Sequence, residues 1–278
     1  MSTEEAIEVG SYLTAATAAA KAAGELQKER LWSEKEISYK GTFDLVTEVD
    51  RRCEELIVER LKGAFPDHSF LAEENAYEIG KVPFKWIIDP LDGTTNYAHG
   101  FPWFCVSIAL EHKDKVLLGV IYHPMMDELF TAVKGEGAFL NGNPIRVSER
   151  EPLRRSLLAT GFPYDRARDN ENNFQNFIKF HLECRGVRRA GAAALDLAYV
   201  AAGRLDGYWE CKLKPWDVAA GSLLVTEAGG EVTNYAGLPY SIYDHRIVAS
   251  NGAIHQEMLE VLDNQNTPRP LGGEACPP

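Results

Sequence analysis

The run from Trp86 to Asn96, with the sequence WIIDPLDGTTN, constrains the fold of this chain more than any other segment. Its apolar start predicts a buried strand that carries Asp89 at its carboxyl end, and Pro90 and Gly93 then turn the chain into a new element. Ligand sites of α/β folds lie beyond the carboxyl ends of strands. Asp89 and Asp92 can therefore converge on cations, and Mg²⁺ prefers a few carboxylates together with carbonyls, waters and substrate phosphate.

The second half of the run fits an anion site. Gly93 leaves room for a ligand close to the backbone, and Thr94, Thr95 and Asn96 would present hydroxyl and N–H groups at the start of a helix. Unpaired backbone donors and the helix dipole stabilise an anion there. Turn chemistry explains the same residues, because Asp-Pro and Asp-Gly form turns and Thr often caps helices. Taken alone, the run leaves both interpretations open.

Other acidic positions favour a ligand site over simple turns. Glu73 and Glu74 follow a predicted strand, Asp50 follows the stretch 44–49, and Asp217 precedes a helix bounded by glycines. The net charge of −12 argues against direct nucleic-acid binding, which depends on clustered Lys and Arg. An acidic chain still binds a phosphorylated metabolite when divalent cations reverse the local field. Clustered carboxylates are therefore the feature that matters.

Helices and strands are predicted to alternate along most of the chain. Apolar residues at helical spacing predict helices, short apolar runs predict strands, and Asn141-Gly142-Asn143 predicts a hairpin turn. The predicted helices cover 4–29, 50–65, 172–181, 192–202, 218–227 and 254–262, and the predicted strands cover 69–72, 85–89, 104–110, 116–122 and 128–133. This pattern is typical of an α/β fold.

The charged stretch 148–155 predicts a boundary between two subdomains. We expect an N-terminal α+β subdomain with the metal-binding motif over 1–150, a C-terminal α/β subdomain over 151–263, and a disordered tail over 264–278, which is rich in Pro and Gly. The N-terminus lacks the basic start of a signal peptide, and Lys21 interrupts the Ala-rich stretch before it reaches spanning length. The chain is therefore expected to be cytoplasmic, without a membrane partner. Its five cysteines contain no Cys-x-x-Cys pair, which favours reduced, packed thiols.

Together these segments closely resemble the inositol monophosphatase family, from the first helix to about Leu262. The resemblance rests on Asp89 to Asn96, on Trp216-Asp217-Val218-Ala219-Ala220-Gly221 and on Glu73-Glu74, in the family's order and at similar spacings. It implies a layered α/β/α/β/α sandwich of the sugar phosphatase type. It also implies Mg²⁺-dependent hydrolysis of a phosphate monoester, foremost inositol monophosphate, by in-line attack of a metal-activated water.

The resemblance also implies roles for individual residues. Glu73, Asp89 and the Leu91 carbonyl would hold one Mg²⁺, and Asp89, Asp92 and Asp217 a second. The catalytic residues would be Asp50 and Thr94, which polarise the attacking water, together with Glu73. The implied substrate-binding residues are Gly93, Thr94, Thr95, Gly191, Ala192, Ala193, Glu210 and Asp217. Four carboxylates and a dianionic phosphate exceed the charge of two Mg²⁺, so a third, weaker ion is expected with the substrate.

Two positions bear on how far the resemblance extends. Ala192 stands where family members often have Ser or Thr, so a hydroxyl contact to the substrate would be missing. Lys40 lies in the segment that corresponds to the family's mobile loop, which is about one residue shorter here than in animal members. The resemblance further implies a homodimer, lithium sensitivity and a small phosphorylated polyol as the binding partner.

Several alternatives stay open at this point. A haloacid-dehalogenase-type phosphatase would explain Asp92-Gly93-Thr94-Thr95, but its motif has one residue between two aspartates where this chain has Pro90 and Leu91. Within the family, fructose 1,6-bisphosphatase, histidinol-phosphate phosphatase and adenosine 3′,5′-bisphosphate phosphatase remain candidates. Arg188 and Arg189 would suit a second phosphate, although ion pairs explain them too. A regulatory binding role, as in bacterial relatives that contact the transcription machinery, also remains.

Overall fold

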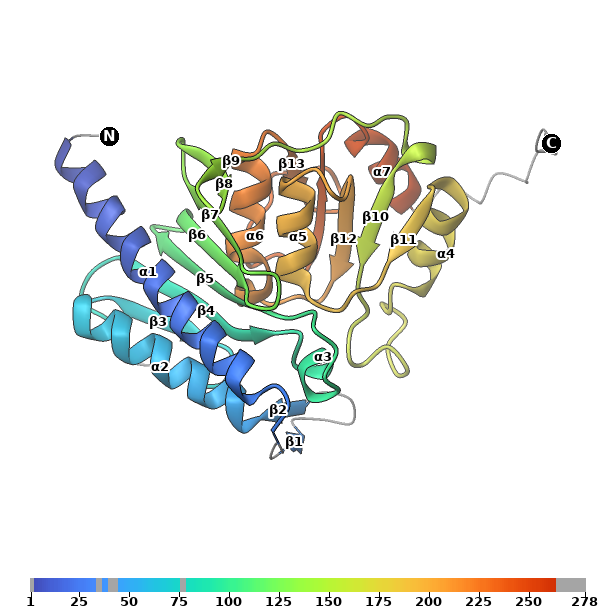
Figure 1. Cartoon of the computed structure of the whole chain (residues 1–278). Helices are drawn as coiled ribbons and strands as arrows, with labels where there is room; N and C mark the ends of the chain where they lie inside the picture. Colours follow the sequence, from blue (N-terminus) through green and yellow to red (C-terminus); the bar gives the residue numbers. More distant parts are fainter. Residues whose placement is uncertain (1–2, 34–36, 40–44, 76–78, 264–278) are drawn as a thin grey trace, which may run out of the picture.

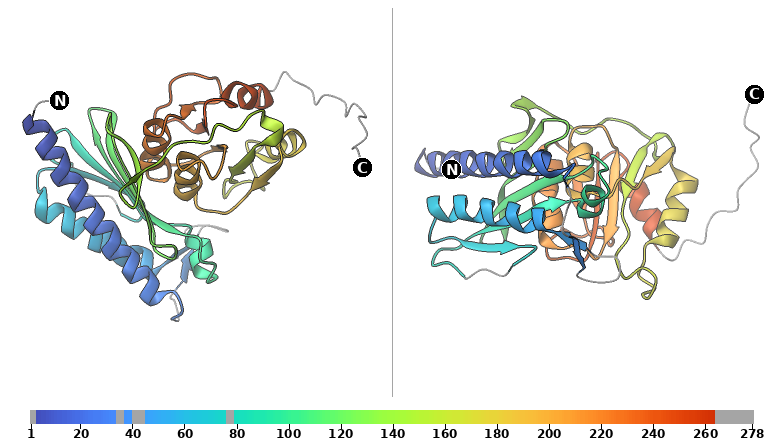
Figure 2. Two further views of the ribbon diagram at one scale, coloured as in Figure 1. Left: turned by 45° about the horizontal axis from the view of Figure 1, so that its top comes forward. Right: turned by 60° about the horizontal axis from the view of Figure 1, so that its bottom comes forward.

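The computed structural model describes residues 3–33, 37–39, 45–75 and 79–263, which form five stacked layers (Figure 1). Helices α1 (Thr3–Arg30) and α2 (Glu48–Ala64) cover the outer face of a first sheet, and Figure 2 shows them side by side. Helices α5 (Ala193–Ala201) and α6 (Pro215–Glu227) lie between this sheet and a second one. Helices α4 (Phe174–Glu183) and α7 (His255–Leu262) cover the far side. The predicted α/β/α/β/α sandwich is confirmed.

The first sheet has seven strands that pair in chain order. Its strands are β3 (Ser69–Ala72), β4 (Phe84–Asp92), β5 (Cys105–His112), β6 (Lys115–His123), β7 (Glu128–Val133), β8 (Gly137–Leu140) and β9 (Asn143–Pro144). Only the pair β3 and β4 is parallel within this sheet. As a consequence, the carboxyl ends of β3 and β4 lie at the same edge of the sheet. Glu73, directly after β3, is therefore a neighbour of Asp89 on β4.

The second sheet has five strands in the order β11, β10, β12, β14, β13. Its strands are β10 (Leu157–Thr160), β11 (Gly186–Arg188), β12 (Gly207–Cys211), β13 (Glu231–Thr233) and β14 (Arg246–Ser250). Strand β10 is parallel to both β11 and β12, so their carboxyl ends also share one edge. The shorter elements are β1 (Ile37–Tyr39) paired with β2 (Leu45–Thr47), the helix α3 (Thr94–Ala98) and the 3-10 turn η1 (Leu153–Arg155).

Burial explains why β4 has a continuous apolar sequence. From Trp86 onward every residue of the strand is buried, because helices cover both faces of the sheet. Trp86 and Ile88 pack into the outer core with α1 and α2, while Ile87 packs into the core shared with α5 and α6. The strand therefore holds its terminal acids on a rigid, double-sided support.

The predicted elements agree with the observed ones, apart from shifts of a few residues at their ends. The strands 69–72 and 128–133 coincide with β3 and β7, and the turn after Leu140 contains Asn141 and Gly142 at positive φ, as a tight hairpin requires. Among the described cysteines, Cys53, Cys105, Cys184 and Cys211 are free thiols. No helix within the described ranges combines the length and the apolar character of a membrane span. Lys40 and the tail 264–278 lie outside the described residues.

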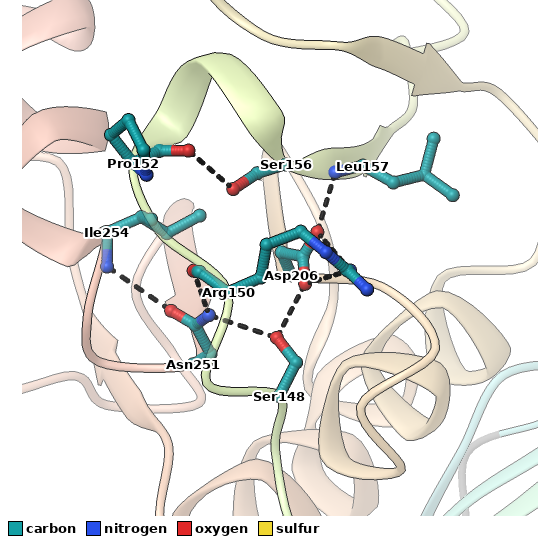
Figure 3. Close-up of polar contacts among 8 residues, drawn as sticks. All are labelled: Ser148, Arg150, Pro152, Ser156, Leu157, Asp206, Asn251 and Ile254. Atoms are coloured by element: carbon teal, nitrogen blue, oxygen red, sulfur yellow. Dashed lines mark hydrogen bonds and ion pairs between the residues drawn. The ribbon is translucent and has the colours of Figure 1, made fainter.

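Asp206 ties the segment between the two large sheets to the second sheet (Figure 3). Its fully buried carboxylate accepts hydrogen bonds from Ser148 Oγ at 2.5 Å, Arg150 Nη1 at 2.8 Å and Leu157 N at 2.7 Å. The Asn251 side chain donates to Ser148 Oγ at 3.0 Å and to the Arg150 carbonyl at 2.9 Å. The predicted boundary at 148–155 falls within this segment, and the division into subdomains stays a prediction.

His123 is buried with neither ring nitrogen hydrogen-bonded to a described residue, and its ring packs edge-on against Trp103. Burial, with a contribution from Arg204, lowers its pKa from 6.5 to about 4. The unfolded chain therefore binds more protons than the folded chain between these values, and stability falls as the pH drops through this window. The loss amounts to about 3 kcal/mol at most.

We accordingly expect the free energy of unfolding of His123→Phe to fall less than that of the wild type as the pH drops below 6.5, because the phenylalanine ring cannot bind a proton. Urea unfolding at pH 7 and pH 5 measures the effect. His245→Asn, at an exposed position, is the control and should leave the pH dependence as in the wild type. An unchanged difference between the two pH values in His123→Phe would contradict this assignment.

Candidate active site

A cavity of about 770 Å³ lies where the carboxyl ends of strands from both sheets meet the starts of three helices. It collects every predicted site residue except Asp50. The lining includes Glu73, Asp89, Leu91, Asp92, Gly93, Thr94, Thr95, Thr160, Gly161, Phe162, Tyr164, Arg166, Arg189, Gly191, Ala192, Ala193, Asp196, Glu210, Lys212, Lys214 and Asp217. Residues far apart in the sequence are therefore brought to one site by the sandwich.

An irregularity in β4 turns its two acids toward this cavity. Asp89 pairs with Ser107 and Asp92 with Cys105, and the register shifts between the two pairs. Gly93 then adopts φ +97, where an added Cβ would lie 2.8 Å from the Trp103 carbonyl oxygen. Only glycine fits this position without strain. The predicted turn is observed at Gly93, whereas the turn expected at Pro90 is wrong, because β4 continues with a register shift through Pro90 to Asp92. Asp89 and Asp92 both lie at the cavity wall.

Backbone N–H groups hold one oxygen of each of three aspartates. The Asp89 carboxylate accepts from Leu91 N at 2.9 Å, and the Asp92 carboxylate from Ala194 N at 2.7 Å. Asp217 Oδ2 accepts from Lys214 N at 2.7 Å, which also caps α6. These contacts fix the orientation of each carboxylate by the fold itself.

The aspartates lie close enough to influence each other's ionisation. Burial first, and then the charges of Glu73, Asp92 and Asp217, raise the pKa of Asp89 well above its usual value. Burial likewise raises the pKa of Asp217, and it raises the pKa of Asp92 to about 6 against the hydrogen bonds that it accepts. Within the described residues, however, no three His, Cys, Asp or Glu side chains form a ready-made set of metal ligands. The cluster is one of hard oxygen donors whose negative charges are mutually unfavourable.

Glu73 is positioned by the chain on either side of it. It follows β3, and its N–H donates to the Ile88 carbonyl at 3.3 Å, which continues the pairing of β3 with β4. The next turn is held by Glu54 of α2, whose carboxylate accepts from Glu74 N at 2.8 Å and from the Asn75 amide at 2.6 Å. Helix α2 thereby fixes the loop that carries Glu73 to the cavity.

Asp50 and Thr94 form a direct pair, as their predicted roles require. Thr94 Oγ1 donates to Asp50 Oδ1 at 2.9 Å and also lies 3.1 Å from the Leu91 carbonyl oxygen. The other oxygen of Asp50 accepts from the backbone and the hydroxyl of Thr47, at 2.9 and 2.5 Å, as the capping box of α2. Burial is the main cause that raises the pKa of Asp50 to about 6. Asp50 does not line the cavity, and Thr94, which does, connects the Asp50 carboxylate to it by a hydrogen bond.

Asn96 joins the motif of the first sheet to the loop that precedes α5. Its side-chain amide lies 2.7 Å from the Trp103 carbonyl oxygen, 2.9 Å from that of Ala190 and 3.3 Å from that of Gly191. Gly191 has φ +91, and Ala192 is the N-cap of α5 without a side-chain cap. The missing hydroxyl at position 192 thus falls at the start of a helix beside the cavity.

Glu210 enters the cavity from β12 on the second sheet. It is 8% exposed, and the Tyr208 hydroxyl donates to its Oε2. Burial is the main cause that raises the pKa of Glu210 to about 7. A Cβ at Gly161 would overlap the Glu210 carboxylate, so a larger residue there would displace the Glu210 side chain. The predicted substrate residue Glu210 therefore shares one cavity with the acids of β4.

The structure also places residues at the cavity that the sequence alone did not single out. Asp196 of α5 lines the cavity. The sequence feature that could have identified it is the presence of an acid within the otherwise apolar helical stretch 192–201. Lys212 holds the loop after β10 against the cavity mouth, with Nζ 2.8 Å from carboxylate oxygens of both Asp165 and Asp169. No periodicity or motif in the sequence predicts the position of that loop, because the loop is held by ion pairs between segments that are distant in the sequence.

Comparison with known proteins identifies the family to which the sequence is similar. A family model described as the inositol monophosphatase family matches residues 9–267. An inositol-1-monophosphatase of Synechocystis sp. is 48% identical over 92% of this chain and 90% of that relative. A protein of Pseudomonas aeruginosa named Nus factor SuhB is 45% identical over 90% of this chain and 95% of that relative.

Solved structures with the same fold support the match. The inositol monophosphatase from Anabaena (Nostoc) sp. PCC 7120 superposes with a TM-score of 0.85 at 44% identity, covering 94% of this chain and 98% of that chain. An IMPase/NADP phosphatase complexed with Mg²⁺ and phosphate superposes with a TM-score of 0.74 at 27% identity, covering 86% and 91%. The similarity thus extends over nearly the whole described chain.

Proposed function

This chain belongs to the inositol monophosphatase family of phosphatases, and we propose that it hydrolyses the phosphate monoester of a small polyol, foremost inositol monophosphate, with Mg²⁺. The observation that carries the proposal is the convergence of Asp89, Asp92, Asp217 and Glu73 on one cavity that also contains Glu210. Hard oxygen donors of this kind suit Mg²⁺. The buried negative charges would be balanced by cations, which the mutual repulsion that raises the pKa values of Asp89 and Asp217 supports.

We propose two principal metal positions. Glu73, Asp89 and the Leu91 carbonyl would hold one ion, and Asp89, Asp92 and Asp217 the other, with a third ion arriving with the substrate. When bound, Mg²⁺ would make water more acidic and stabilise the charge on the leaving oxygen of an in-line displacement. The backbone contacts to Leu91 N, Ala194 N and Lys214 N support this arrangement, because they hold the aspartates in place before any ion binds.

Asp50 and Thr94 would orient the attacking water. Asp50 Oδ1 accepts the hydroxyl hydrogen of Thr94, so the lone pairs of Thr94 Oγ1 are left to accept a hydrogen bond from water. The positioned water then meets the phosphorus opposite the leaving oxygen. Backbone N–H groups of Thr94 and Thr95 at the start of α3 would bind the phosphate, and those of Gly191 to Ala193, with Glu210, the polyol.

Phosphate release from inositol 1-phosphate is the direct test of this function. We expect activity with Mg²⁺, loss of activity in excess chelator, and recovery when Mg²⁺ is restored, because the attacking water is too weakly acidic alone. Inhibition by lithium is expected as well, through competition for the more weakly held ion. Full activity in excess chelator would contradict the proposed mechanism.

Glu210→Gln is expected to act on polyol substrates selectively. The amide keeps an oxygen to accept from Tyr208 but removes the charge that a ring hydroxyl would meet, at a cost of about 1 to 3 kcal/mol. This corresponds to an increase of about 5- to 150-fold in KM for inositol 1-phosphate. Steady-state kinetics with inositol 1-phosphate and with 4-nitrophenyl phosphate, which has no hydroxyl group, separate the effect from general damage.

Ala192→Ser complements this variant, since it supplies the hydroxyl that the chain lacks. We expect wild type to discriminate loosely among inositol monophosphates, glycerol 2-phosphate and nucleoside monophosphates, and Ala192→Ser to discriminate more strongly. High selectivity of the wild type for a bisphosphate, with Glu210→Gln changing all substrates equally, would contradict the inositol monophosphate assignment and leave the phosphatase assignment intact.

A regulatory role is a second candidate, supported by the relative named Nus factor SuhB. Such a role would be carried by the surface and would survive loss of catalysis. We further propose that the chain acts in the cytoplasm as a homodimer, for which light scattering at micromolar concentration is the measurement.

A further inference from the structure

Asp196 is a buried acid of the cavity for which the proposed mechanism has no use. It is the fourth residue of α5, it is 2% exposed, and it lines the same cavity as Asp92 and Glu210. Its Oδ1 atom is buried and has no hydrogen-bond partner among the described residues. Among the described residues that line the cavity, Asp196 Oδ1 is the one buried side-chain oxygen or nitrogen atom without a hydrogen-bond partner.

Such a group is costly to keep in a folded protein. Burying a polar group without a hydrogen bond is unfavourable, and the carboxyl group of Asp196 additionally faces the charges of Glu210 and Asp92. Arg189 is the charged group that offsets them, and it is itself exposed. Burial and these neighbours raise the pKa of Asp196 well above its usual value. Unsatisfied buried groups of this kind concentrate at functional sites, where a ligand completes them.

Asp206 shows what a structural buried aspartate looks like in the same protein. It is also fully buried, but its two carboxylate oxygens accept from Ser148, Arg150 and Leu157. Asp196 makes no comparable contact to the fold, although the helix around it is otherwise apolar and packed. Packing alone would therefore be served better by an apolar residue at position 196.

Glu210 supplies the second half of a recognition site. The Tyr208 hydroxyl donates to its Oε2, its charge contributes to the raised pKa of Asp196, and both residues line the same cavity. Two carboxyl groups on different elements, α5 and β12, present more hydrogen-bonding positions than one hydroxyl group can use. Two neighbouring hydroxyl groups of a ring would use both.

We propose that Asp196 is a specificity-determining residue that, together with Glu210, binds two neighbouring hydroxyl groups of a polyol monophosphate. The proposal rests on the proposed function and extends it from one hydroxyl contact to a pair. It predicts a lower KM for phosphate monoesters whose ring carries adjacent hydroxyl groups near the ester than for monoesters that lack them. A bound cation at the same carboxyl pair is the competing occupant.

The closing experiment compares Asp196→Leu and Asp196→Asn with the matched control Asp206→Asn. We expect Asp196→Leu to raise KM for inositol 1-phosphate at least about tenfold, since one ring hydroxyl loses the carboxylate that accepts its hydrogen bond, with kcat changed much less. KM for 4-nitrophenyl phosphate should stay as in the wild type. The thermal midpoint should rise, because an unpartnered buried carboxyl is removed. Asp206→Asn should lower the midpoint and leave the ratio of the two KM values unchanged.

Several outcomes would overturn the proposal. An unchanged KM ratio in both Asp196 variants does so, and so does a fall in the thermal midpoint without a kinetic effect, which would mark a structural residue. If Asp196→Leu does not fold, the nearly isosteric Asp196→Asn carries the kinetic test. Loss of Mg²⁺ affinity in Asp196→Asn, measured by calorimetry, would assign the pair to a cation. If the wild type itself fails to hydrolyse inositol 1-phosphate, the proposed function fails first.

Discussion

Asp89→Asn is expected to reduce the hydrolysis of phosphate monoesters by about a thousandfold or more and to weaken Mg²⁺ binding at the same time. Asp89 is 2% exposed, and the charges of Glu73, Asp92 and Asp217 add to burial in raising its pKa, so it lies within the electrostatic influence of all three acids. The amide still accepts from Leu91 N, which preserves this backbone contact. What is lost is the charge that would hold both proposed ions, and electrostatic stabilisation is commonly the largest contribution to catalysis.

Calorimetric titration with Mg²⁺ and steady-state phosphate release measure the two losses separately. Thr94→Ala is the matched control, because it removes the hydroxyl that contacts Asp50 but no charge. It should lower the rate by about a hundredfold and leave Mg²⁺ affinity nearly as in the wild type. Wild-type Mg²⁺ affinity in Asp89→Asn, or its loss in Thr94→Ala, would contradict the proposed division of roles.

Asp206→Ala is expected to cause the largest loss of stability, about 3 kcal/mol in the free energy of unfolding. The change leaves the half-buried Leu157 N–H and Ser148 hydroxyl without the acceptor that the fully buried Asp206 carboxylate provides. The ion pair with Arg150 adds less, since the arginine side chain is 45% exposed and is screened by solvent. The segment between the two sheets would keep its contacts to Asn251, to the Ala228 carbonyl and to Glu257.

Urea unfolding followed by circular dichroism measures this loss, provided the transition is two-state. Asp165→Ala is the control, because Asp165 is exposed and its ion pair with Lys212 lies at the protein surface. That variant should change stability by less than about 0.5 kcal/mol. Equal stability of Asp206→Ala and the wild type would show that the buried contacts are replaced by others, contrary to our expectation.

Local sequence determined most of the secondary structure. Helix α2 illustrates this, because its capping box at Thr47 and Asp50 and its inward residues Cys53, Ile57 and Leu61 are all encoded within one segment. Strand β4 was recognisable from a continuous apolar run that ends in acids. Such features depend on neighbours in the sequence, which is why their positions could be predicted to within a few residues.

The motif acids were also predictable, since Asp89, Asp92 and Asp217 sit beside residues that end or begin elements. The pairing of Asp50 with Thr94 followed from the family resemblance, and the 2.9 Å contact agrees with it. Metal binding by these residues stays a prediction, as does the reading of residues 1–150 and 151–263 as subdomains.

Only the tertiary structure decided which distant residues share the cavity. The bridge from Asn96 to the Ala190 carbonyl, the ion pairs of Lys212 with the loop after β10, and the unpartnered oxygen of Asp196 each depend on segments that meet after folding. Solvent exclusion and the hydrogen-bond partners of a side chain belong to that assembled environment, and no sequence window contains them. The sequence by itself therefore determined the elements and the acids at their ends, while the packing of two sheets around α5 and α6 determined the cavity, its charges and its unsatisfied group.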